Sequence, residues 1–351
     1  MPTTQLRARV TVFDGGEVWL KEIDLPTRGT GEIDVAIEAG AVCGSDLHTV
    51  LGHRSAPPEV ALGHEGVGRV VDIDEGATDQ RGRPLSAGDR VVFALFSACG
   101  TCDRCRDGLE MKCRTLFKYG HESIEKAPHA SGTLASHVRL LPGVPVLTIP
   151  DGLTAAQVVS AGCSVATAAA MVRTLGDRAD GRTLVFGAGA VGAYCAAILA
   201  TLGSEVYVSD PSPTRLAVAE KLGARAYTGS EEPFPAVLEA SGNANAFVNA
   251  LETADIGGMV VAAGSVSPGS TTVTFDPSLA VTRRLTLVGI HNYSADDFVW
   301  AVDWLGEHAA SLELEQLLSP PQPLDDIESA FDLMETGEHL RVLVVPNDTR
   351  G

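Results

Sequence analysis

Residues 183–192 read TLVFGAGAVG, and this stretch decides the fold of the second half of the chain. Its apolar and β-branched start is typical of a buried strand, and the glycines after it open a run of small residues that favours a helix. In a G-x-G-x-x-G turn, Gly187 allows the tight bend and Gly189 lets the backbone approach a pyrophosphate. Gly192 allows the helix to pack closely on the strand, and the N-terminus of the helix holds the anion. We expect these glycines, together with Val191 in the same turn, to bind a dinucleotide.

A carboxylate stands at the end of the next expected strand, residues 205–210 (EVYVSD). Asp210 follows Gly187 at about the distance where an acidic side chain accepts hydrogen bonds from the ribose hydroxyls of NAD and repels the 2′-phosphate of NADP. The alternative is that Asp210 only begins the turn Asp-Pro-Ser-Pro. The glycine turn that precedes it favours the cofactor role.

Strands and helices alternate on both sides of this turn, which predicts a doubly wound parallel sheet and an α/β fold class. Strands are expected at 183–187, 205–210, 225–228, near 235–240, at 258–263 and at 285–290, and helices at 155–175, 190–202, 213–222 and 244–253. After residue 292 we expect helices at 295–308 and 325–335, a Pro-rich loop at 319–323 and a last strand at 340–345.

The first part of the chain is rich in short strands instead. Apolar or alternating runs at 7–12, 18–24, 32–38, 67–73 and 89–95 are separated by Gly, Pro and Asp turn signals. This pattern predicts a compact antiparallel, barrel-like domain. A length of 351 residues is consistent with two domains.

The composition limits which binding partners and which cellular compartment we expect for the protein. A formal net charge of −19 makes nucleic acid and anionic membranes unfavourable partners. No apolar run reaches the length of a membrane span, since glycines interrupt the most apolar stretch, 183–202, and no signal peptide is recognisable. We therefore expect a cytoplasmic protein whose seven cysteines are reduced, so that clustered cysteines favour metal binding over disulfides.

Four of these cysteines form one cluster, with the spacing C-x2-C-x2-C-x7-C: Cys99, Cys102, Cys105 and Cys113. Four thiolates at such a spacing can close a tetrahedral shell around one zinc ion, and a closed shell indicates a structural site. An iron–sulfur cluster uses similar ligands and is the alternative.

A second set of metal-binding side chains is spread over three segments: CGSDLH (43–48), GHE (63–65) and AGC (161–163). Cys43, His64 and Cys163 together would give an open catalytic zinc site with three protein ligands, where the metal acidifies a bound alcohol. Taken singly, Cys163 is as typical of a buried core residue, and His64 of a hydrogen-bonded core histidine.

With the motifs AGAVCGSDLH (39–48), GHEGVG (63–68), the cysteine run 99–113 and GAGAVG with Asp210, the chain resembles the medium-chain, zinc-containing alcohol dehydrogenase family over essentially its full length. The resemblance implies a GroES-like catalytic domain, residues 1–153 and 291–351, interrupted by a Rossmann domain, residues 154–290. It also implies two zinc ions per chain, NAD as cofactor, and hydride transfer between a small-molecule alcohol and NAD(H).

The resemblance also assigns roles near the catalytic zinc. Ser45 matches the hydroxyl that hydrogen-bonds the substrate alcohol, and His48 matches the outer end of a proton relay through the cofactor ribose. Asp46 matches a residue that orients a ligand histidine, here His64. Glu65 matches a glutamate that lies near the metal and can replace water as a ligand.

For the cofactor and the assembly, Arg341 matches an arginine that contacts the pyrophosphate, and Arg215 a basic residue near the adenosine ribose. Relatives pair the edge strand, here 285–290, into dimers and some dimers into tetramers, so a homodimer or homotetramer is expected. The competing hypotheses are a zinc-free enone reductase, a polyol or cyclitol dehydrogenase, and a non-catalytic redox sensor. The zinc ligands argue against the first, and Ser45 and His48 against the last.

Several segments are similar to the phosphonate-associated branch of the family: LFKYGHE (116–122), AGCSVATAAA (161–170), SDPSPTR (209–215), AGSVSPG (263–269) and GIHNYSADD (289–297). This similarity implies a small alcohol or aldehyde that carries a phosphonate. Such a dianion needs cations, and the candidates are Lys118, His121, Arg54, His53 and His291. The alternative is that Lys118 and Arg54 are solvated and that His291 only shapes the hinge near the nicotinamide.

Overall fold

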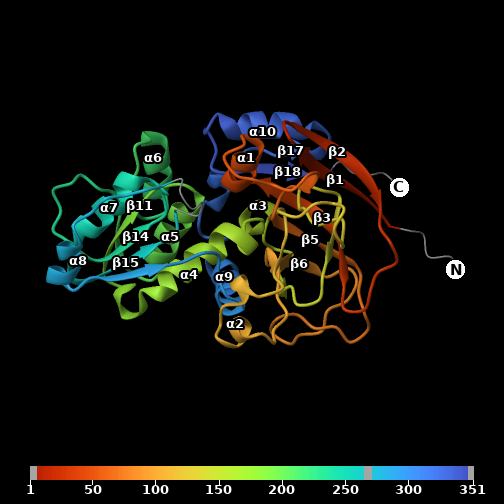
Figure 1. Ribbon diagram of the computed structural model, residues 1–351, viewed down its shortest axis with the longest axis horizontal. Coiled ribbons are helices and arrows are strands. Elements are labelled where there is room, and N and C mark those ends of the chain that lie inside the picture. The colour runs from red at the N-terminus through yellow and green to blue at the C-terminus, as the bar shows by residue number, and fades with distance from the viewer. Residues whose placement is uncertain (1–5, 265–270, 347–351) are drawn as a thin grey trace. The chain divides into compact units, whose positions relative to one another are not determined.

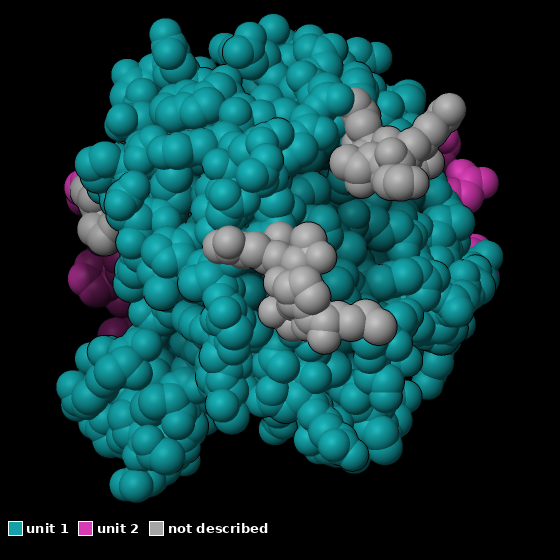
Figure 2. Space-filling model, turned by 90° about the vertical axis from the view of Figure 1, so that its right-hand side faces the viewer, with its two compact units in different colours: residues 1–163, 294–310, 314–351 teal, residues 164–293, 311–313 magenta. Residues whose placement is uncertain are grey.

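The computed structural model describes residues 6–264 and 271–346 (Figure 1), and the chain divides into two compact units. Unit 1 comprises residues 1–163, 294–310 and 314–351, and unit 2 comprises residues 164–293 and 311–313 (Figure 2). The expected domains divided at 153/154 and at 290/291, whereas the units divide at 163/164 and at 293/294. Residues 154–163 belong to unit 1 because the helix they begin packs on its sheet.

Unit 1 is built on a mixed sheet whose strands run in the order β10-β6-β5-β3-β18-β17, with β9 also paired to β3. All of its pairs are antiparallel except β17 with β18. A three-stranded sheet, β2-β1-β4, and the pair β7-β8 complete the unit. The strands are β1 Arg7–Asp14, β2 Glu17–Asp24, β3 Ile33–Val42, β4 Val60–Ala61, β5 Glu65–Asp72, β6 Arg90–Phe93, β7 Phe96–Ser97, β8 Phe117–Lys118, β9 His137–Leu140, β10 Val146–Thr148, β17 Gln322–Pro323 and β18 Val342–Val345.

The register of the large sheet decides which loop ends meet. Ala41 on β3 is opposite Glu65 on β5, and Val42 is opposite Val342 on β18. The segments that begin at Cys43, end at His64 and end at Arg341 therefore leave the sheet at neighbouring points.

The helices of unit 1 are α1 Gly44–Val50, α2 Asp103–Arg106, α3 Ala155–Val158, α9 Ala295–His308 and α10 Ile327–Glu335. The helices expected at 295–308 and 325–335 agree with α9 and α10. The sequence did not predict the short elements α1, α2, β4, β7, β8, β9 and β10, because elements of two to seven residues are too short to show a clear periodicity. The Pro-rich loop expected at 319–323 ends in the short strand β17, which pairs with β18.

Unit 2 has a six-stranded parallel sheet in the order β13-β12-β11-β14-β15-β16, as the alternation of strands and helices predicted. The strand order reverses between β11 and β14, which is the switch point where such sheets bind their ligands. The strands are β11 Arg182–Phe186, β12 Glu205–Ser209, β13 Arg225–Ala226, β14 Phe234–Glu239, β15 Ala254–Ala262 and β16 Thr286–Gly289. The helices are α4 Ala166–Thr174, α5 Ala190–Thr201, α6 Pro213–Lys221, α7 Ala244–Thr253 and α8 Pro277–Arg283, of which α8 was not predicted.

The helix expected at 155–175 is not regular. A π-helical turn at Ala161–Val165 separates α3 from α4. The cause is the close approach of this segment to β6, since a Cβ atom added at Gly162 would lie 2.0 Å from the carbonyl oxygen of Phe93. π-turns of this kind are frequent at functional sites.

The same segment corrects the expectation that no apolar run reaches the length of a membrane span. Among the described residues, the helical run Ala155–Thr174 is long and apolar enough to cross one, but 72% of its most apolar window is buried inside the protein. Burial to this extent is typical of a core helix in a globular domain.

Candidate active site and metal centres

The catalytic candidates meet where β3 ends and β5 begins. The Cys43 Sγ atom lies 3.1 Å from Nε2 of His64, and both side chains are buried. Gly63 makes this approach possible, because its φ is +91° and an added Cβ would lie 2.5 Å from the backbone nitrogen of Leu134. A bulkier residue at this point would push His64 away from Cys43.

Asp46 holds both sides of this junction. Its carboxylate accepts hydrogen bonds from the backbone N–H groups of Cys43 and Gly63, each at 3.0 Å, and Oδ1 lies 3.5 Å from Nδ1 of His64. Nδ1 of His64 is buried and has no hydrogen-bond partner in the described part of the chain. The ring therefore presents Nε2 to Cys43 and faces Asp46 with its other nitrogen, which is the arrangement of a metal-binding histidine oriented by a carboxylate.

The π-turn brings Cys163 to the same place. Burial raises the pKa of Cys43, but the hydrogen bond from Cys163 and the charges of His64 and Arg341 outweigh it and hold that pKa well below its usual range. The hydrogen bond with Cys43 and burial raise the pKa of Cys163. Despite burial, Cys43 and Asp46 raise the pKa of His64 to about 10. Two thiols and an imidazole from three distant segments thus share one proton network, and this donor set suits zinc.

Glu65 is fully buried and paired on both oxygens. Oε1 accepts a hydrogen bond from Nε of Arg341 at 2.9 Å, and Oε2 accepts one from the hydroxyl of Ser160 at 2.6 Å. The structure therefore places Arg341 on Glu65 at the catalytic centre, and its expected contact with the pyrophosphate stays a prediction. Sequence reasoning missed Ser160, because a lone serine among small helical residues carries no signal.

The two residues expected to carry the proton lie on α1. The hydroxyl oxygen of Ser45 is 2.9 Å from Sγ of Cys43 and 3.2 Å from Nε2 of His64. His48, one turn further along the helix, is exposed, and its Nδ1 lies 3.3 Å from Nδ1 of His53. Ser45 therefore lies beside the proposed metal ligands, and His48 lies in solvent. These positions suit the inner and the outer end of a proton relay.

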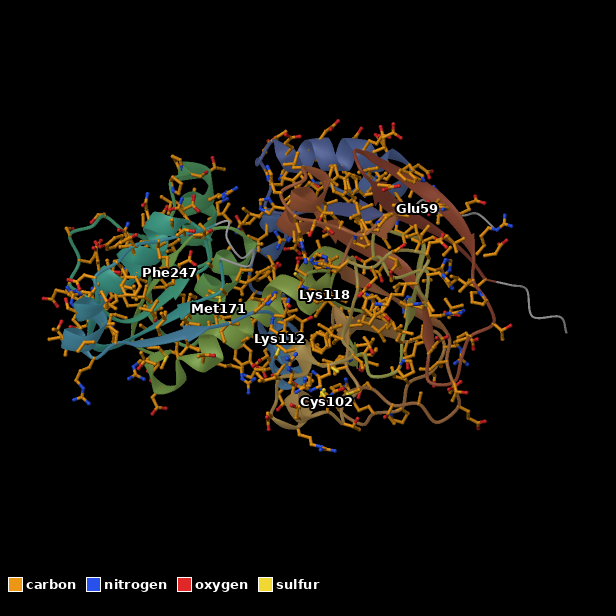
Figure 3. The ribbon with its side chains drawn as sticks, viewed as in Figure 1. Glu59, Cys102, Lys112, Lys118, Met171 and Phe247 are labelled. Atoms are coloured by element: carbon orange, nitrogen blue, oxygen red, sulfur yellow. The ribbon has the colours of Figure 1, made fainter. Side chains whose placement is uncertain are left out.

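Three of the five cations expected to receive a dianion belong to this neighbourhood. Lys118, labelled in Figure 3, and Arg54 are half-buried, and the ring centroid of His121 is 5.2 Å from that of His64. His53 pairs with exposed His48. His291 lies in unit 2.

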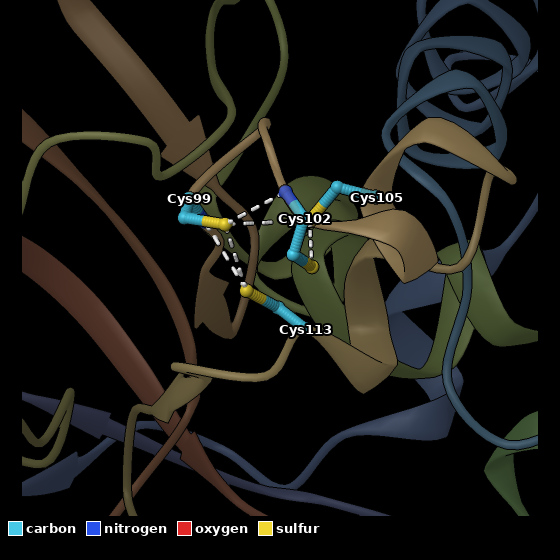
Figure 4. A group of neighbouring side chains, drawn as sticks. All are labelled: Cys99, Cys102, Cys105 and Cys113. Carbon is cyan, nitrogen blue, oxygen red and sulfur yellow. Dashed lines mark hydrogen bonds between the residues drawn. The ribbon is translucent and has the colours of Figure 1, made fainter.

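The four clustered cysteines converge around one point (Figure 4). The Sγ atoms of Cys102 and Cys105 are 3.5 Å apart, those of Cys113 and Cys99 are 3.5 Å apart, and those of Cys99 and Cys105 are 4.0 Å apart. A tetrahedral ion with Zn–S bonds of about 2.3 Å has S···S edges of about 3.8 Å. The spacing therefore fits a single ion, whereas an iron–sulfur cluster places several atoms between its thiolates.

The electrostatics of the cluster favour a bound cation as well. Backbone and side-chain hydrogen bonds from Thr101 lower the pKa of Cys99 to about 5, while burial raises the pKa of Cys105 to about 12. All seven cysteines of the chain are free of disulfides. Four sulfur atoms this close compete for protons, and a divalent ion that replaces the protons relieves this competition.

In unit 2 the Gly-rich turn has the shape expected for a pyrophosphate. Gly187 has a φ of +94°, and an added Cβ at Gly192 would lie 1.8 Å from the carbonyl oxygen of Gly187. Gly189 is the N-cap of α5, and an added Cβ there meets nothing within 4 Å. Open space at the N-terminus of a helix leaves room for an anionic group.

Asp210 lies beside this turn, one residue past β12. Its Oδ2 accepts a hydrogen bond from the backbone N–H of Ala188 at 2.8 Å, and Oδ1 accepts one from Ser212 at 2.9 Å. Val191 is the second residue of α5, and Arg215 lies in the first turn of α6. Asp210 therefore begins the turn Asp-Pro-Ser-Pro and also lies beside the Gly-rich turn. The two interpretations from sequence do not exclude each other.

Two remaining expectations concern unit 2. Cys195 is buried in α5 against Met171, as expected for a core residue. Of the segment 263–269, residues 265–269 lie outside the described residues.

Two family models match the chain. Residues 29–151 match the alcohol dehydrogenase GroES-like domain, and residues 190–307 match the zinc-binding dehydrogenase domain. Together they cover most of the chain, including the cysteine cluster, Cys43 and His64, and of the three glycines in the Gly-rich turn they include Gly192.

Curated relatives match over nearly the full length. An L-threonine 3-dehydrogenase of Chelativorans sp. (strain BNC1) is 28% identical over 97% of this chain and 99% of its own. An alcohol dehydrogenase of Moraxella sp. (strain TAE123) is 29% identical over 95% of this chain and 97% of its own. Among solved structures, an alcohol dehydrogenase of Thermotoga maritima has a TM-score of 0.89 and 28% identity, and the match covers 97% of this chain and 100% of that one.

Proposed function

Because the chain belongs to the medium-chain, zinc-dependent alcohol dehydrogenase family, we propose that it transfers a hydride between an alcohol, or the corresponding aldehyde or ketone, and NAD(H). It is an oxidoreductase whose cofactors are zinc and a nicotinamide dinucleotide. The observation that carries the proposal is the convergence of Cys43, His64 and Cys163 beside the hydroxyl of Ser45.

The proposal includes two zinc ions per chain, because the described residues contain two groups of potential ligands: the four clustered cysteines, and Cys43 with Asp46 and His64. Cys163 joins the second group through its hydrogen bond with Cys43, while Asp46 already accepts two backbone hydrogen bonds. Cys43, His64 and Cys163 would hold the catalytic ion, and the cluster of Cys99, Cys102, Cys105 and Cys113 would hold a structural one. A catalytic zinc supplies a Lewis acid that lowers the pKa of an alcohol. Glu65 can replace water as a zinc ligand only when its hydrogen bonds with Arg341 and Ser160 are broken.

The chain's own residues move the proton. The Ser45 hydroxyl, which lies 2.9 Å from Sγ of Cys43, receives the proton of the alcohol, and the exposed His48 imidazole releases it to solvent. His53, at 3.3 Å from His48, offers a second acceptor at the exit. Asp46 keeps the His64 ring oriented while the charge of the centre changes.

NAD rather than NADP is the proposed dinucleotide. The carboxylate of Asp210 accepts hydrogen bonds from the ribose hydroxyls and disfavours a 2′-phosphate. Arg215 is proposed to contact the adenosine ribose and Arg341 the pyrophosphate, which Gly187, Gly189, Val191 and Gly192 cradle.

The proposed substrate is a small polar alcohol, and the most specific candidate is an alcohol that carries a phosphonate. One relative bears the name L-threonine 3-dehydrogenase, which makes a hydroxy amino acid a second candidate. A polyol or cyclitol is the third. A non-catalytic redox-sensing role is less favoured, because the Ser45 hydroxyl lies beside Cys43 and His48 is exposed to solvent, which supports the proposed proton relay.

We further propose a homodimer or homotetramer in the cytoplasm that binds neither nucleic acid nor membranes. The net charge of −19 supports the expectation that neither nucleic acid nor membranes bind. The homo-oligomer is supported by β16, which forms an edge of the parallel sheet.

Metal analysis of the purified protein tests the proposal first. We expect about two zinc ions per chain, given two ligand groups. About one ion would leave only a structural site, and none would overturn the assignment to zinc chemistry.

A substrate panel tests the reaction itself. Small alcohols, polyols, L-threonine and phosphonate-bearing alcohols are offered with NAD, and the reverse reactions with NADH, while absorbance at 340 nm is followed. At least one alcohol or carbonyl class should change the absorbance in a zinc-dependent manner. Full zinc occupancy without turnover of any class would support the redox-sensing role instead.

A further inference from the structure

Two cations beside the catalytic centre have no counter-charge in direct contact. Lys118 is the last residue of β8, and Arg54 lies in the loop after α1. Both side chains are half-buried, and within residues 6–264 and 271–346 neither forms a side-chain hydrogen bond or ion pair. Half-buried cations are usually paired, since desolvation makes an isolated charge costly.

Backbone contacts place both cations beside the centre. Gly120, two residues after Lys118, lies against His64, since an added Cβ there would be 3.0 Å from Nδ1 of the ring, and the backbone N–H of Arg54 donates a hydrogen bond of 3.1 Å to the carbonyl oxygen of His48. The charges of Arg54, Cys163, Lys112 and Cys43 all affect Lys118, and those of Asp46 and Cys43 affect Arg54. The segments that carry Lys118, Arg54 and the three proposed zinc ligands all belong to unit 1.

The cations are not needed to neutralise the centre. Two thiolates from Cys43 and Cys163 offset the charge of a divalent ion, and Glu65 is already paired with Arg341. Asp46 is the remaining carboxylate, and it is occupied by two backbone N–H groups and faces His64. Its charge acts on Arg54, and the groups that favour the charged form of Lys118 are the Cys43 and Cys163 thiols, which a bound divalent ion would neutralise.

Partial burial disfavours the charged form of Lys118. Burial, together with the charges of Arg54 and Lys112, lowers the pKa of Lys118 to about 8 although the two thiols act in the opposite direction. Lys118 is still mostly protonated at neutral pH. His121 adds no charge here, because burial and the charges of His64, Lys118 and Arg54 hold its pKa well below the usual range.

We propose that Lys118 and Arg54 form a subsite for an anionic group, a carboxylate, phosphonate or phosphate, that the alcohol substrate carries beside its hydroxyl. The proposal rests on the proposed function, since the reacting hydroxyl must be at Ser45. The Lys118 ammonium is a compact point charge, whereas the Arg54 guanidinium can hold two oxygens of one anion. Substrates with a fixed anion would thereby be oriented, and uncharged alcohols would gain nothing from either side chain.

Three alcohols of similar length separate the charge classes: 1-propanol, 3-hydroxypropanoate and 2-hydroxyethylphosphonate. The kcat/KM of each is measured with NAD for the zinc-loaded wild type and for Lys118→Gln, Arg54→Gln and Lys126→Gln. Lys126 is the matched control, because it is paired with Glu122 at 2.8 Å and lies over the ring of Phe117.

For the wild type we expect kcat/KM to be at least about tenfold higher with an anionic alcohol than with 1-propanol. Lys118→Gln should lower the value for the anionic alcohols by about 10- to 100-fold, as for a charge-assisted hydrogen bond, and change that for 1-propanol less than about threefold. Lys126→Gln should leave all three values unchanged. A phosphonate preferred over the carboxylate identifies a dianion subsite, and the reverse preference identifies a monoanion subsite.

Calorimetric titration without cofactor gives a readout independent of turnover. The dissociation constant of 2-hydroxyethylphosphonate or 3-hydroxypropanoate should rise about tenfold or more in Lys118→Gln and stay constant in Lys126→Gln. Thermal unfolding checks that each variant is folded. Should Lys118→Gln not fold, Lys118→Met keeps the apolar stem without the charge, and Lys118→Arg should retain the preference for anions.

The outcomes separate this inference from the proposed function. Turnover of 1-propanol equal to that of the anionic alcohols, with both unaffected by Lys118→Gln, would overturn the subsite and leave the dehydrogenase intact. An equal loss for charged and uncharged alcohols would also overturn it, because Lys118 would then have only a structural role. No turnover of any alcohol or carbonyl compound, with zinc bound, would instead overturn the proposed function.

Discussion

Cys163 has two interpretations from sequence, a core residue or a metal ligand, and its surroundings separate them. It follows Gly162, whose contact with Phe93 forces the π-turn, and it donates a hydrogen bond to the Cys43 thiolate. Cys195, the other cysteine in a small-residue helix, packs on Met171 and has no such neighbour in the described residues. The two cysteines therefore form a matched pair for mutation.

Cys163→Ala should remove about one zinc ion per chain and lower kcat/KM by roughly a hundredfold or more, since the loss of a ligand exceeds that of its supporting hydrogen bonds. NADH binding, measured by fluorescence titration, should persist, because the Gly-rich turn of unit 2 is untouched. Cys195→Ala should keep both the zinc content and turnover. If Cys163→Ala retained full zinc and turnover, Cys163 would be a core residue.

Asp210 is the residue expected to select NAD. Its hydrogen bonds with Ala188 and Ser212 also stabilise the turn. The effect of its charge on cofactor selection must therefore be separated from its effect on the structure of the turn. Asp210→Asn keeps an oxygen acceptor and removes the charge. We expect the ratio of kcat/KM for NAD to that for NADP to fall at least about tenfold, which corresponds to about 1.4 kcal/mol.

Asp210→Ala should reduce the ratio as well and in addition lower the melting temperature, because two backbone N–H groups lose their acceptor. A ratio that neither substitution changes would show that Asp210 only shapes the turn.

At this scale the sequence predicted most of the residues that the structure brings together at the candidate site. The spacing of Cys99, Cys102, Cys105 and Cys113 predicted one tetrahedral group because close spacing along a loop forces proximity. Ser160 could not be predicted, since its partner Glu65 is far away in the chain. For Arg341, the family resemblance suggested a contact with the cofactor, whereas its described side-chain partner is the carboxylate of Glu65.

At the scale of elements, the strand–turn–helix unit β11–α5 contains two glycines with different physical requirements. Gly192 has no room for a Cβ, while Gly189 has open space and an ordinary φ of −65°. One glycine is thus required for packing, and the other leaves space that a ligand can use.

Gly192→Ala should destabilise the protein by about 1–3 kcal/mol or more, since backbone must move to relieve the contact with Gly187. Gly189→Ala should change stability by less than about 0.5 kcal/mol but weaken NADH binding by about tenfold, because the methyl group would enter the open space proposed for the pyrophosphate. Denaturant unfolding and NADH titration measure the two effects. Equal stability losses in both variants would contradict the assignment.

Elements were predictable where a pattern repeats over several residues. The parallel sheet of unit 2 and the longer strands of unit 1 followed from apolar runs between turn signals. The π-turn at 161–165 was not predictable, because its cause is the contact of Gly162 with β6 and not the composition of the helix. α8 was missed because its seven residues show no clear apolar stripe.

At the scale of the whole molecule, unit 2 exposes apolar side chains on its edge strand β16, on the neighbouring strand β15 and on helix α8. Leu287 on β16 is 49% exposed, and Ile256 and Val281 are 76% and 74% exposed. An unpaired edge strand with exposed apolar residues favours association with a second copy.

Leu287→Asp should therefore shift the protein toward monomers, since pairing would bring two like charges into a buried edge. Analytical ultracentrifugation measures the change. Val71→Asp is the control, because Val71 on β5 is 43% exposed but lies in unit 1. A wild type that is monomeric at all concentrations would contradict the proposed homo-oligomer.

The sequence by itself determined the features that depend on neighbours along the chain: the strand and glycine turn, the parallel sheet and the four-cysteine loop. Only the tertiary structure decided which distant residues meet. The register of β3 with β5 and β18 brings Cys43, His64, Glu65 and Arg341 together, and the contact of Gly162 with β6 adds Cys163. It also left Lys118 unpaired beside them. The physical reason is that periodicity and turn chemistry act locally, whereas register and close packing are properties of the folded sheet.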